Sequence, residues 1–343
     1  MTTVGLGERG RMRADDQIPL GRTGLLVSRL GLGLASLGGL FAPVDEADAA
    51  AVLERAWQLG IRLYDTAPVY GYGLSERRAG TALARRPRDA FVLSTKVGRL
   101  IECGGPDTQP IWADPPQGVG PRKDYSYAGV LRSVTESLQR LGLDRVDMLH
   151  VHDPDEEFGT AVGEAYRALA DLRERGVISA VSIGVNHAPV AARFLREAAA
   201  PGPDCVLLAG RYGLLDQSGL EELLPLCSER GVAVLAAGVY HGGLLAEPGP
   251  GTPHAHTGVA PETAARITAW RKLCGRFEVP LLAAALQFPW GHPAVAAVVV
   301  GARTAAEVEQ SAAWLSHPLP AELWGEARHA GLLPKGCPAP SLP

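Results

Sequence analysis

The stretch 59-LGIRLYD-65 decides the fold, because its pattern returns twice further along the chain. The segments 175-RGVISAV-181 and 230-RGVAVLA-236 repeat the same order, a Gly followed by a short apolar run. Gly at the end of a helical pattern is a stop signal for a helix, and a short apolar run rich in β-branched residues is typical of a buried strand. The three segments therefore predict a repeated unit of helix, tight turn and strand.

Eight short apolar runs predict strands, at residues 28–33, 61–64, 91–96, 146–152, 180–185, 205–209, 233–237 and 295–299. Helical patterns follow nearly all of them, at residues 46–59, 75–85, 127–141, 160–175, 189–199, 220–230, 261–277 and 304–315. Eight strands, each followed by a helix, are typical of a (β/α)8 barrel. The alternative, a doubly wound sheet, expects GxGxxG after the first strand and an acidic residue about 20 residues further on. The stretch 31-GLGLASLGG-39 has its glycines in a different register, which favours the barrel.

Segments outside the predicted strands and helices complete the predicted organisation. The segment 17-QIPLGRTGLLVS-28 predicts a β-hairpin that closes the N-terminal end of the barrel. We expect a disordered leader at residues 1–15, a single barrel domain at 16–330 and a loose Pro-rich tail at 331–343. The connections 98–126 and 238–260 are longer than ordinary links. Because both follow strands, they lie at the C-terminal face of the barrel, where barrel enzymes place their active sites, and we expect them to be lids.

The composition limits the classes of partner. The chain has 343 residues, 46% hydrophobic and 20% charged, with a net charge of −4. Basic residues are scattered among acidic ones, which argues against binding of nucleic acid. No apolar run reaches the roughly 20 residues that span a membrane.

The five widely spaced cysteines indicate free thiols in a reducing cytoplasm. His254 and His256 share a loop, but a metal site needs more ligands. We expect a cytoplasmic monomer or small homo-oligomer that acts on a small molecule.

Four residues with catalytic chemistry lie at or just after the ends of predicted strands. Asp65 ends the second strand and Tyr70 follows in its loop, while Lys96 and His152 end the third and fourth. A barrel brings these ends around one axis. A lysine ammonium favours a nearby phenolate and lowers the pKa of that tyrosine, and an aspartate keeps the lysine charged. Tyr70 then serves as general acid/base on a carbonyl or alcohol oxygen that a histidine orients. The matching hydride requires a nicotinamide cofactor, because no side chain supplies one.

Each of these residues also has an ordinary structural interpretation. Asp65 could cap its turn, Tyr70 could simply pack, and Lys96 could be a solvated charge. His150 points to the same side of its strand as His152, so either histidine could be the functional one. A lysine at a barrel strand end is also what a Schiff-base aldolase requires. The conjunction of all four residues favours the oxidoreductase.

The segments YDTAPVYG, STKVG and VDMLHVHDPD resemble the signature segments of the aldo-keto reductases, which are (β/α)8 enzymes that use NADPH or NADH. The resemblance extends over residues 18–315. It implies that the four residues above form the catalytic tetrad of that family. It also selects His152 over His150, although Asp153 stands where the family usually has an aromatic residue.

The resemblance also implies contacts to a nicotinamide cofactor. Asn186 matches the residue that holds the carboxamide, and Tyr212 matches the aromatic residue that stacks on the nicotinamide ring. The segment 238-GVYHGGLL-245 resembles the glycine-rich loop at the pyrophosphate, and 300-VGARTAAEVEQS-311 resembles the adenosine-binding stretch. The implied cofactor-binding residues in these two segments are Gly238, Val239, Tyr240, Gly242, Gly301, Arg303, Glu307, Gln310 and Ser311.

Glu307 stands where NADP-specific relatives often have a cation for the 2′-phosphate. A carboxylate repels a phosphate but accepts hydrogen bonds from a free ribose diol. The resemblance therefore implies NAD as the cofactor, with NADP as the alternative.

Within the family, YGYGLSERRAGTAL, STKVGRL and AGRYGLLDQ are most similar to the branch of D-threo-aldose 1-dehydrogenase (L-fucose dehydrogenase), L-galactose dehydrogenase and pyridoxal 4-dehydrogenase. This similarity implies oxidation of an aldose such as L-fucose or D-arabinose at C1. The alternatives are a pyridoxal 4-dehydrogenase, a broad NADPH-dependent aldehyde or ketone reductase and, more remotely, an aldolase that uses Lys96. The expected substrate contacts from the first long connection are Trp112, Tyr125 and Tyr127.

Overall fold

A computed structural model describes residues 11–104, 109–246 and 259–340 of the chain, and the statements below concern these residues. His254 and His256, and the first ten residues of the expected leader, lie outside them.

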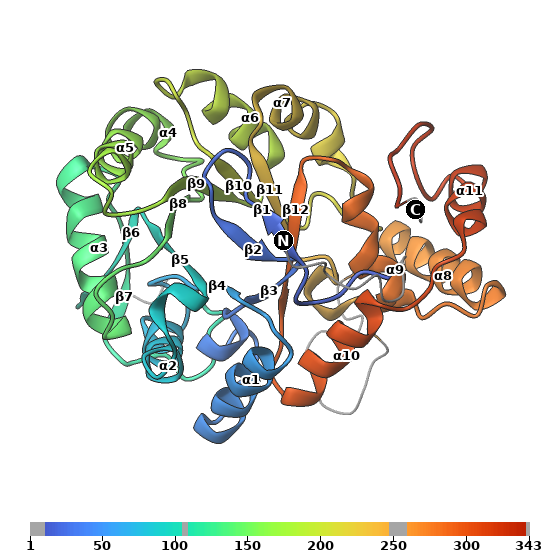
Figure 1. The fold of residues 1–343 in the computed structure, drawn as a ribbon, viewed down its shortest axis with the longest axis horizontal. Coiled ribbons are helices and arrows are strands. Elements are labelled where there is room, and N and C mark those ends of the chain that lie inside the picture. The colour runs from blue at the N-terminus through green and yellow to red at the C-terminus, as the bar shows by residue number, and fades with distance from the viewer. Residues whose placement is uncertain (1–10, 105–108, 247–258, 341–343) are drawn as a thin grey trace, which may run out of the picture.

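Eight parallel strands form a closed barrel, in which each strand pairs with its neighbours along the chain and the last pairs with the first (Figure 1). The strands are β3 (Leu30–Gly33), β4 (Leu63–Asp65), β5 (Val92–Val97), β8 (Met148–His152), β9 (Ala180–Val185), β10 (Cys205–Ala209), β11 (Ala233–Ala237) and β12 (Val295–Gly301). All eight overlap the predicted strands. The (β/α)8 barrel is thus confirmed.

Helices surround the barrel on all sides in Figure 1. They are α1 (Glu46–Gln58), α2 (Leu74–Leu83), α3 (Tyr127–Leu141), α4 (Phe158–Thr160), α5 (Tyr166–Glu174), α6 (Ala188–Glu197), α7 (Leu223–Arg230), α8 (Pro261–Arg276), α9 (Leu281–Gln287), α10 (Ala305–Leu315) and α11 (Ala321–His329). A π-helical turn, Ala161–Ala165, joins α4 to α5. The sequence predicted eight of the helical segments but not α9 or α11.

Local signals explain where several helices begin and end. The Ser126 side chain accepts a hydrogen bond from the backbone N–H of Gly129 and so caps the start of α3. Gly142 and Gly231 end α3 and α7 with left-handed φ values of 62° and 64°. A side chain is strained in this region and glycine is not, which is why glycine stops these helices.

Side chains alternate between the barrel interior and the helix layer along each strand, because the strand period is two. In β4, Leu63 belongs to the apolar cluster inside the barrel and Tyr64 to the cluster under the helices. The next residue, Asp65, therefore points inward. In β8, Met148 lies in the interior cluster, and the same alternation carries His152 inward at the end of the strand.

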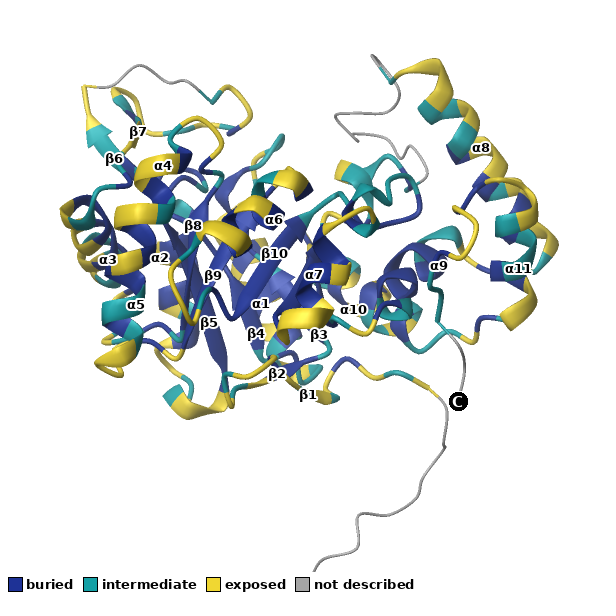
Figure 2. Cartoon of the chain, turned by 90° about the horizontal axis from the view of Figure 1, so that it is seen from above, coloured by how far each residue is buried: buried dark blue, intermediate teal, exposed yellow. Residues whose placement is uncertain are grey.

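Two antiparallel hairpins lie at opposite ends of the barrel (Figure 2). Strands β1 (Gln17–Pro19) and β2 (Leu26–Ser28) form the first hairpin, as predicted, and place Leu20 and Val27 in the interior cluster. The second consists of β6 (Arg99–Cys103) and β7 (Val119–Lys123), within the connection that was expected to be a loop. That expectation was incomplete, because Pro and Gly in the connection obscure a pairing between residues distant in sequence.

The two chain ends of the barrel domain also differ from expectation. In the tail, Leu332, Leu333 and Cys337 are buried, and the Arg328 guanidinium donates to the Cys337 carbonyl at 2.9 Å. The tail is therefore packed rather than loose as far as residue 340.

At the other end, Ala14 is buried, so the part of the expected leader that the structure describes also contacts the core. In the three described ranges, no helix has the length and hydropathy needed to cross a membrane.

Candidate active site

The strand register brings four polar side chains to one level inside the barrel. Asp65 pairs with Ser94 across β4 and β5, and Lys96 pairs with His150 across β5 and β8. Ser94 and Lys96 are two residues apart and so point to the same side of their strand. Because Asp65 ends its strand, this level is the C-terminal end of the barrel, which is where barrel enzymes place their chemistry.

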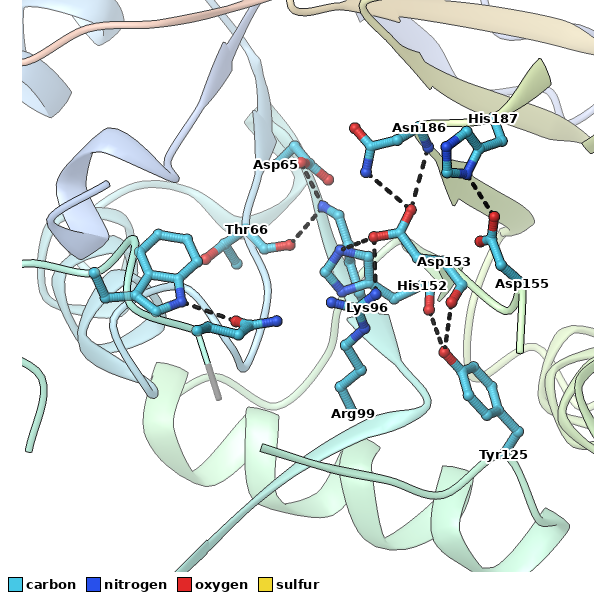
Figure 3. A network of polar contacts seen from close by, with 12 residues as sticks. Asp65, Thr66, Lys96, Arg99, Tyr125, His152, Asp153, Asp155, Asn186 and His187 are labelled. Atoms are coloured by element: carbon cyan, nitrogen blue, oxygen red, sulfur yellow. Dashed lines mark hydrogen bonds and ion pairs between the residues drawn. The ribbon is translucent and has the colours of Figure 1, made fainter. Parts of the chain in front are cut away.

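A buried ion pair forms the base of the site. Lys96 Nζ lies 2.5 Å from Asp65 Oδ2, and the two side chains are only 1% and 5% exposed. The ammonium also donates to the carbonyl of Thr66 at 2.9 Å (Figure 3). The second carboxylate oxygen, Oδ1, accepts a hydrogen bond from Ser94 Oγ at 2.8 Å and lies 3.2 Å from Nε2 of His150.

The charges of this pair follow from competing effects. Burial raises the pKa of Asp65, but the Lys96 ammonium and His150 together outweigh burial and hold that pKa at about 2. Burial lowers the pKa of Lys96, yet its interactions with Asp65 and Tyr70 leave it raised overall. Both groups are therefore ionised at neutral pH.

The ion pair predicts a specific acid sensitivity. The folded-state pKa of Asp65 is about 2, below an unfolded value of about 3.9. Its stabilisation, on the order of 2–3 kcal/mol, is present above about pH 4 and is lost as the pH falls toward about 2. Asp65→Asn should therefore lower the Tm most near neutral pH, and the difference from wild type should shrink below about pH 4. Circular dichroism melts over this pH range measure the difference; a constant difference would contradict the assignment.

Tyr70 lies above the ion pair, in the loop after β4. The Lys96 ammonium is 5.0 Å from the centre of its ring, and the His152 ring meets it edge to face at 6.1 Å. Burial raises the pKa of Tyr70 by more than Lys96 lowers it. The predicted influence of Lys96 thus has the right direction, but the expected net decrease was wrong because burial is the larger effect. The Trp112 ring also packs against Tyr70, with the two ring centres 5.6 Å apart.

His152 is a neutral imidazole at pH 7. Burial, followed by the positive charges of Arg99 and Lys96, lowers its pKa well below 6.5. Its Nδ1 is buried and has no hydrogen-bond partner in the described part of the chain, and its Nε2 is 3.6 Å from Asp153 Oδ2. The imidazole contacts Tyr70, whereas His150 lies deeper, between Asp65 and Ser182. The structure thus brings together the four residues expected from the sequence.

A second polar network surrounds His152 (Figure 3). Asp153 Oδ1 accepts hydrogen bonds from the backbone N–H and the side-chain amide of Asn186, at 3.2 and 3.1 Å. Asp153 Oδ2 accepts from Arg99 Nη2 at 3.0 Å. Sequence reasoning missed Arg99 and Asp153 as site residues. The available signal was that both are charged residues close behind strands that carry site residues: Asp153 directly follows β8, and Arg99 stands two residues after the end of β5.

The structure corrects two of the predicted substrate contacts. The Tyr125 side chain is 1% exposed, and its hydroxyl donates to the carbonyls of His152 and Asp153 at 2.5 and 3.0 Å. Tyr127 lies at the first residue of α3, and its hydroxyl donates to Asp171 Oδ2 in α5 at 2.8 Å. Both hydroxyls are committed to the protein. Of the three predicted residues, Trp112 is the one whose ring packs against the side chain of a tetrad member, Tyr70.

Two of the segments predicted to bind cofactor lie next to each other. The Tyr240 hydroxyl, in the loop after β11, is 3.4 Å from Ser311 Oγ in α10. Three glycines of these segments are exposed, Gly238, Gly242 and Gly301. Gln310 is also exposed, whereas Val239 is buried. A Cβ added to Gly238 would come within 3.0 Å of the backbone N of Gly210. A Cβ on Gly242 would meet nothing within 4 Å, and exposed glycine backbone of this kind allows phosphate oxygens to approach N–H groups closely.

Arg303 and Glu307 mark the start of α10. Glu307 Oε2 accepts a hydrogen bond from the Arg303 backbone N–H at 2.7 Å. The Arg303 guanidinium donates to the Leu40 carbonyl at 3.1 Å, while its Nε is buried without a partner among the residues described. A cation with an unused donor and a helix N-terminus suit an anionic cofactor group, so this part of the chain fits a dinucleotide.

The expected role of Tyr212 was wrong. Its side chain is 1% exposed, and its ring packs on Phe288 at 5.2 Å and on His292 at 6.0 Å. A ring enclosed in this way has no free face for a nicotinamide. Asn186, by contrast, is exposed at the barrel mouth and remains a candidate for the carboxamide.

Known proteins share both the sequence and the fold. The profile of the Aldo/keto reductase family matches residues 29–330. The chain is 42% identical to pyridoxal 4-dehydrogenase of Microbacterium luteolum, over 94% of this chain and 99% of that protein. It is 40% identical to D-threo-aldose 1-dehydrogenase of Pseudomonas sp, over 91% of this chain and 96% of that protein. The holo form of an aldo-keto reductase from Bacillus halodurans superposes with a TM-score of 0.74 at 28% identity, covering 91% and 95% of the two chains.

Proposed function

The chain belongs to the aldo/keto reductase family, and from this premise we propose that it is an NAD-dependent dehydrogenase that oxidises an aldose at C1. The substrate would be the cyclic form of a sugar such as L-fucose or D-arabinose, and the product a lactone. The observation that carries the proposal is the buried Lys96–Asp65 ion pair beside Tyr70 and His152. The names of the two relatives, which refer to an aldose and to pyridoxal, support this substrate class.

Tyr70 is the residue to which we assign proton transfer. During oxidation its oxygen accepts the proton of the C1 hydroxyl, while the C1–H bond breaks with its electron pair and C1–O becomes a carbonyl. A nicotinamide cofactor, which the loop after β11 and the start of α10 would hold, would supply the hydride acceptor. The Lys96 ammonium stabilises the phenolate of Tyr70 before that proton arrives. The neutral His152 holds the reacting oxygen by a hydrogen bond.

The charge of Lys96 argues against the aldolase alternative. A Schiff base forms only when the lysine amine is neutral. The Lys96 ammonium donates to Asp65 and Thr66, and its pKa is raised. An amine that stays protonated at neutral pH is a poor nucleophile, so we do not retain an aldolase.

A substrate screen tests the proposed activity. Formation of reduced cofactor is followed by absorbance with NAD⁺ and NADP⁺ over L-fucose, D-arabinose, L-galactose and pyridoxal. Oxidation of at least one aldose with NAD⁺ is the expected result. Turnover of pyridoxal alone would replace the proposal by a pyridoxal 4-dehydrogenase. Reduction of simple aldehydes with NADPH, without aldose oxidation, would indicate a broad reductase.

Glu307 is proposed to set the preference for NAD. Its carboxylate lies at the start of α10, where it would repel a 2′-phosphate. Glu307→Gln keeps an oxygen for the Arg303 N–H but removes the charge, so the ratio of kcat/KM for NADP⁺ to that for NAD⁺ should rise about 5- to 10-fold. Glu309→Gln is the matched control, because Glu309 pairs with Arg55 on the surface. An unchanged ratio in Glu307→Gln would mean that Glu307 serves only to cap the helix.

The thiols support a further part of the proposal. All five cysteines are free, and only Cys103 of them is exposed. Free thiols suit the reducing cytoplasm, which we propose as the location of the enzyme. We also propose a monomer or small homo-oligomer, which light scattering would test.

A further inference from the structure

A charged pair beside the proposed catalytic residues has no part in the mechanism above. Arg99 Nη2 donates to Asp153 Oδ2 at 3.0 Å, and the two side chains are 16% and 15% exposed (Figure 3). Asp153 Oδ1 is occupied by two hydrogen bonds from Asn186. The other oxygen, Oδ2, faces His152, whose Nε2 is 3.6 Å away.

The backbone around Asp153 is held in an unusual conformation. Its φ is 38°, in the left-handed region that few residues other than glycine adopt. The Tyr125 hydroxyl fixes the carbonyls of His152 and Asp153, and the Tyr125 ring fills the space that a Cβ on Gly98 would need. Strained backbone that its surroundings hold in place is concentrated at functional sites. The direction of the Asp153 carboxylate is therefore fixed by several independent contacts.

We propose that Arg99 and Asp153 bind the hydroxyl group on the carbon next to the reacting carbon of the substrate. A hydroxyl both donates and accepts. It can donate to Asp153 Oδ2 while it accepts from the guanidinium of Arg99, whose Nε is buried without a partner in the described ranges. The inference rests on the proposed function, which places the reacting oxygen at Tyr70 and His152.

The distance between the polar atoms of His152 and Asp153 fits a substrate that carries oxygens on two adjacent carbons. His152 Nε2 and Asp153 Oδ2 are 3.6 Å apart. Oxygens on adjacent carbons are about 3 Å apart, close to a hydrogen-bond length, so one can contact each atom. An aldose has such a hydroxyl at C2, the carbon next to C1. Simple aldehydes lack this hydroxyl, so we expect the Arg99–Asp153 pair to make the enzyme discriminate against them.

Two pairs of substrates, each differing in this hydroxyl, provide the test. L-fucose is compared with 2-deoxy-L-fucose in oxidation, and glycolaldehyde with propanal in reduction. The wild-type kcat/KM should favour the hydroxylated member by roughly 10- to 100-fold, as expected for a hydrogen bond to a charged group. Asp153→Asn should reduce this preference to below about 3-fold, mainly by lowering kcat/KM for the hydroxylated member.

The variant keeps an acceptor oxygen for Asn186, so the affinity for NAD⁺ and NADH, measured by quenching of protein fluorescence, should change less than about 2-fold. Asp155→Asn is the matched control, because the substitution is the same and Asp155 bonds instead to His187. It should retain the wild-type preference. If Asp153→Asn does not fold, Arg99→Met tests the same hydroxyl from the other side of the pair.

Three results would overturn the inference. The first is a wild-type enzyme without preference for the hydroxylated substrates. The second is an equal loss with both members of a pair in Asp153→Asn, and the third is a parallel loss of cofactor affinity, which would mean that Asp153 acts through Asn186. Failure of the proposed function is a separate result: no aldose would be oxidised, while glycolaldehyde and propanal would still test the pair.

Discussion

Replacing Tyr70 with Phe should lower kcat by about 10²- to 10⁴-fold, the contribution typical of a positioned general acid/base. The variant keeps the ring that packs on Trp112 and His152, so binding of NAD⁺ and NADH should change less than about 2-fold. Stopped-flow or steady-state kinetics and fluorescence titration measure the two quantities separately. Turnover that survives in Tyr70→Phe would show that the mechanism is wrong.

Tyr127→Phe is the control for this substitution. It removes a hydroxyl that is hydrogen-bonded to Asp171 between two outer helices, and it should leave kcat unchanged.

The pH dependence of the oxidation rate adds a second criterion for the role of Tyr70. Because burial holds the pKa of Tyr70 above its ordinary value, the residue is protonated at neutral pH and the oxidation rate should rise with pH on the alkaline side. The residual rate of Tyr70→Phe should lack this rise.

Removal of the Lys96 ammonium should affect stability and activity together. Lys96→Met leaves the Asp65 carboxylate buried with no opposite charge, which costs about 3–5 kcal/mol in comparable buried pairs. We expect the Tm to fall by roughly 6–15 °C. We expect kcat to fall by at least about two orders of magnitude, because the phenolate of Tyr70 loses its counter-charge.

The double variant Asp65→Asn with Lys96→Met separates the two effects. It removes both charges, so most of the lost stability should return, as expected when a buried pair is replaced as a unit. Activity should stay at the level of the single variant. A double variant that is as unstable as Lys96→Met would contradict a coupled pair, and one that regains activity would contradict the catalytic role of Lys96.

The barrel could be predicted because its strands are short, apolar and rich in β-branched residues, with glycine stops before several of them. The hairpin of β6 and β7 could not, because its pairing joins residues such as Cys103 and Val119 across a Pro-rich connection. Helix α9 was missed for another reason. Its sequence, LLAAALQ, is too short and too uniformly apolar to show a helical period.

In the active site, too, some features could be predicted from the sequence and others could not. The tetrad was predictable because strand ends converge in a barrel and alternation fixes the inward side of each strand. The directions of loop side chains were not. Tyr125 turns inward because Gly98 adopts a φ of 98° and leaves room for its ring, and Asp153 reaches Arg99 and Asn186 from a φ of 38°. Neither angle is visible in the residue types alone.

The β6–β7 hairpin has a consequence for how this enzyme can diversify. Its two strands form a sheet of their own that contains no barrel strand, yet its first residue, Arg99, reaches the Asp153 carboxylate. Trp112, from the segment that joins the two strands, covers Tyr70. Insertions or deletions between Cys103 and Val119 would therefore leave every barrel register and Arg99 in place. Evolution, or an engineer, can exchange this segment to admit a larger or smaller substrate without redesigning the chemistry beneath it.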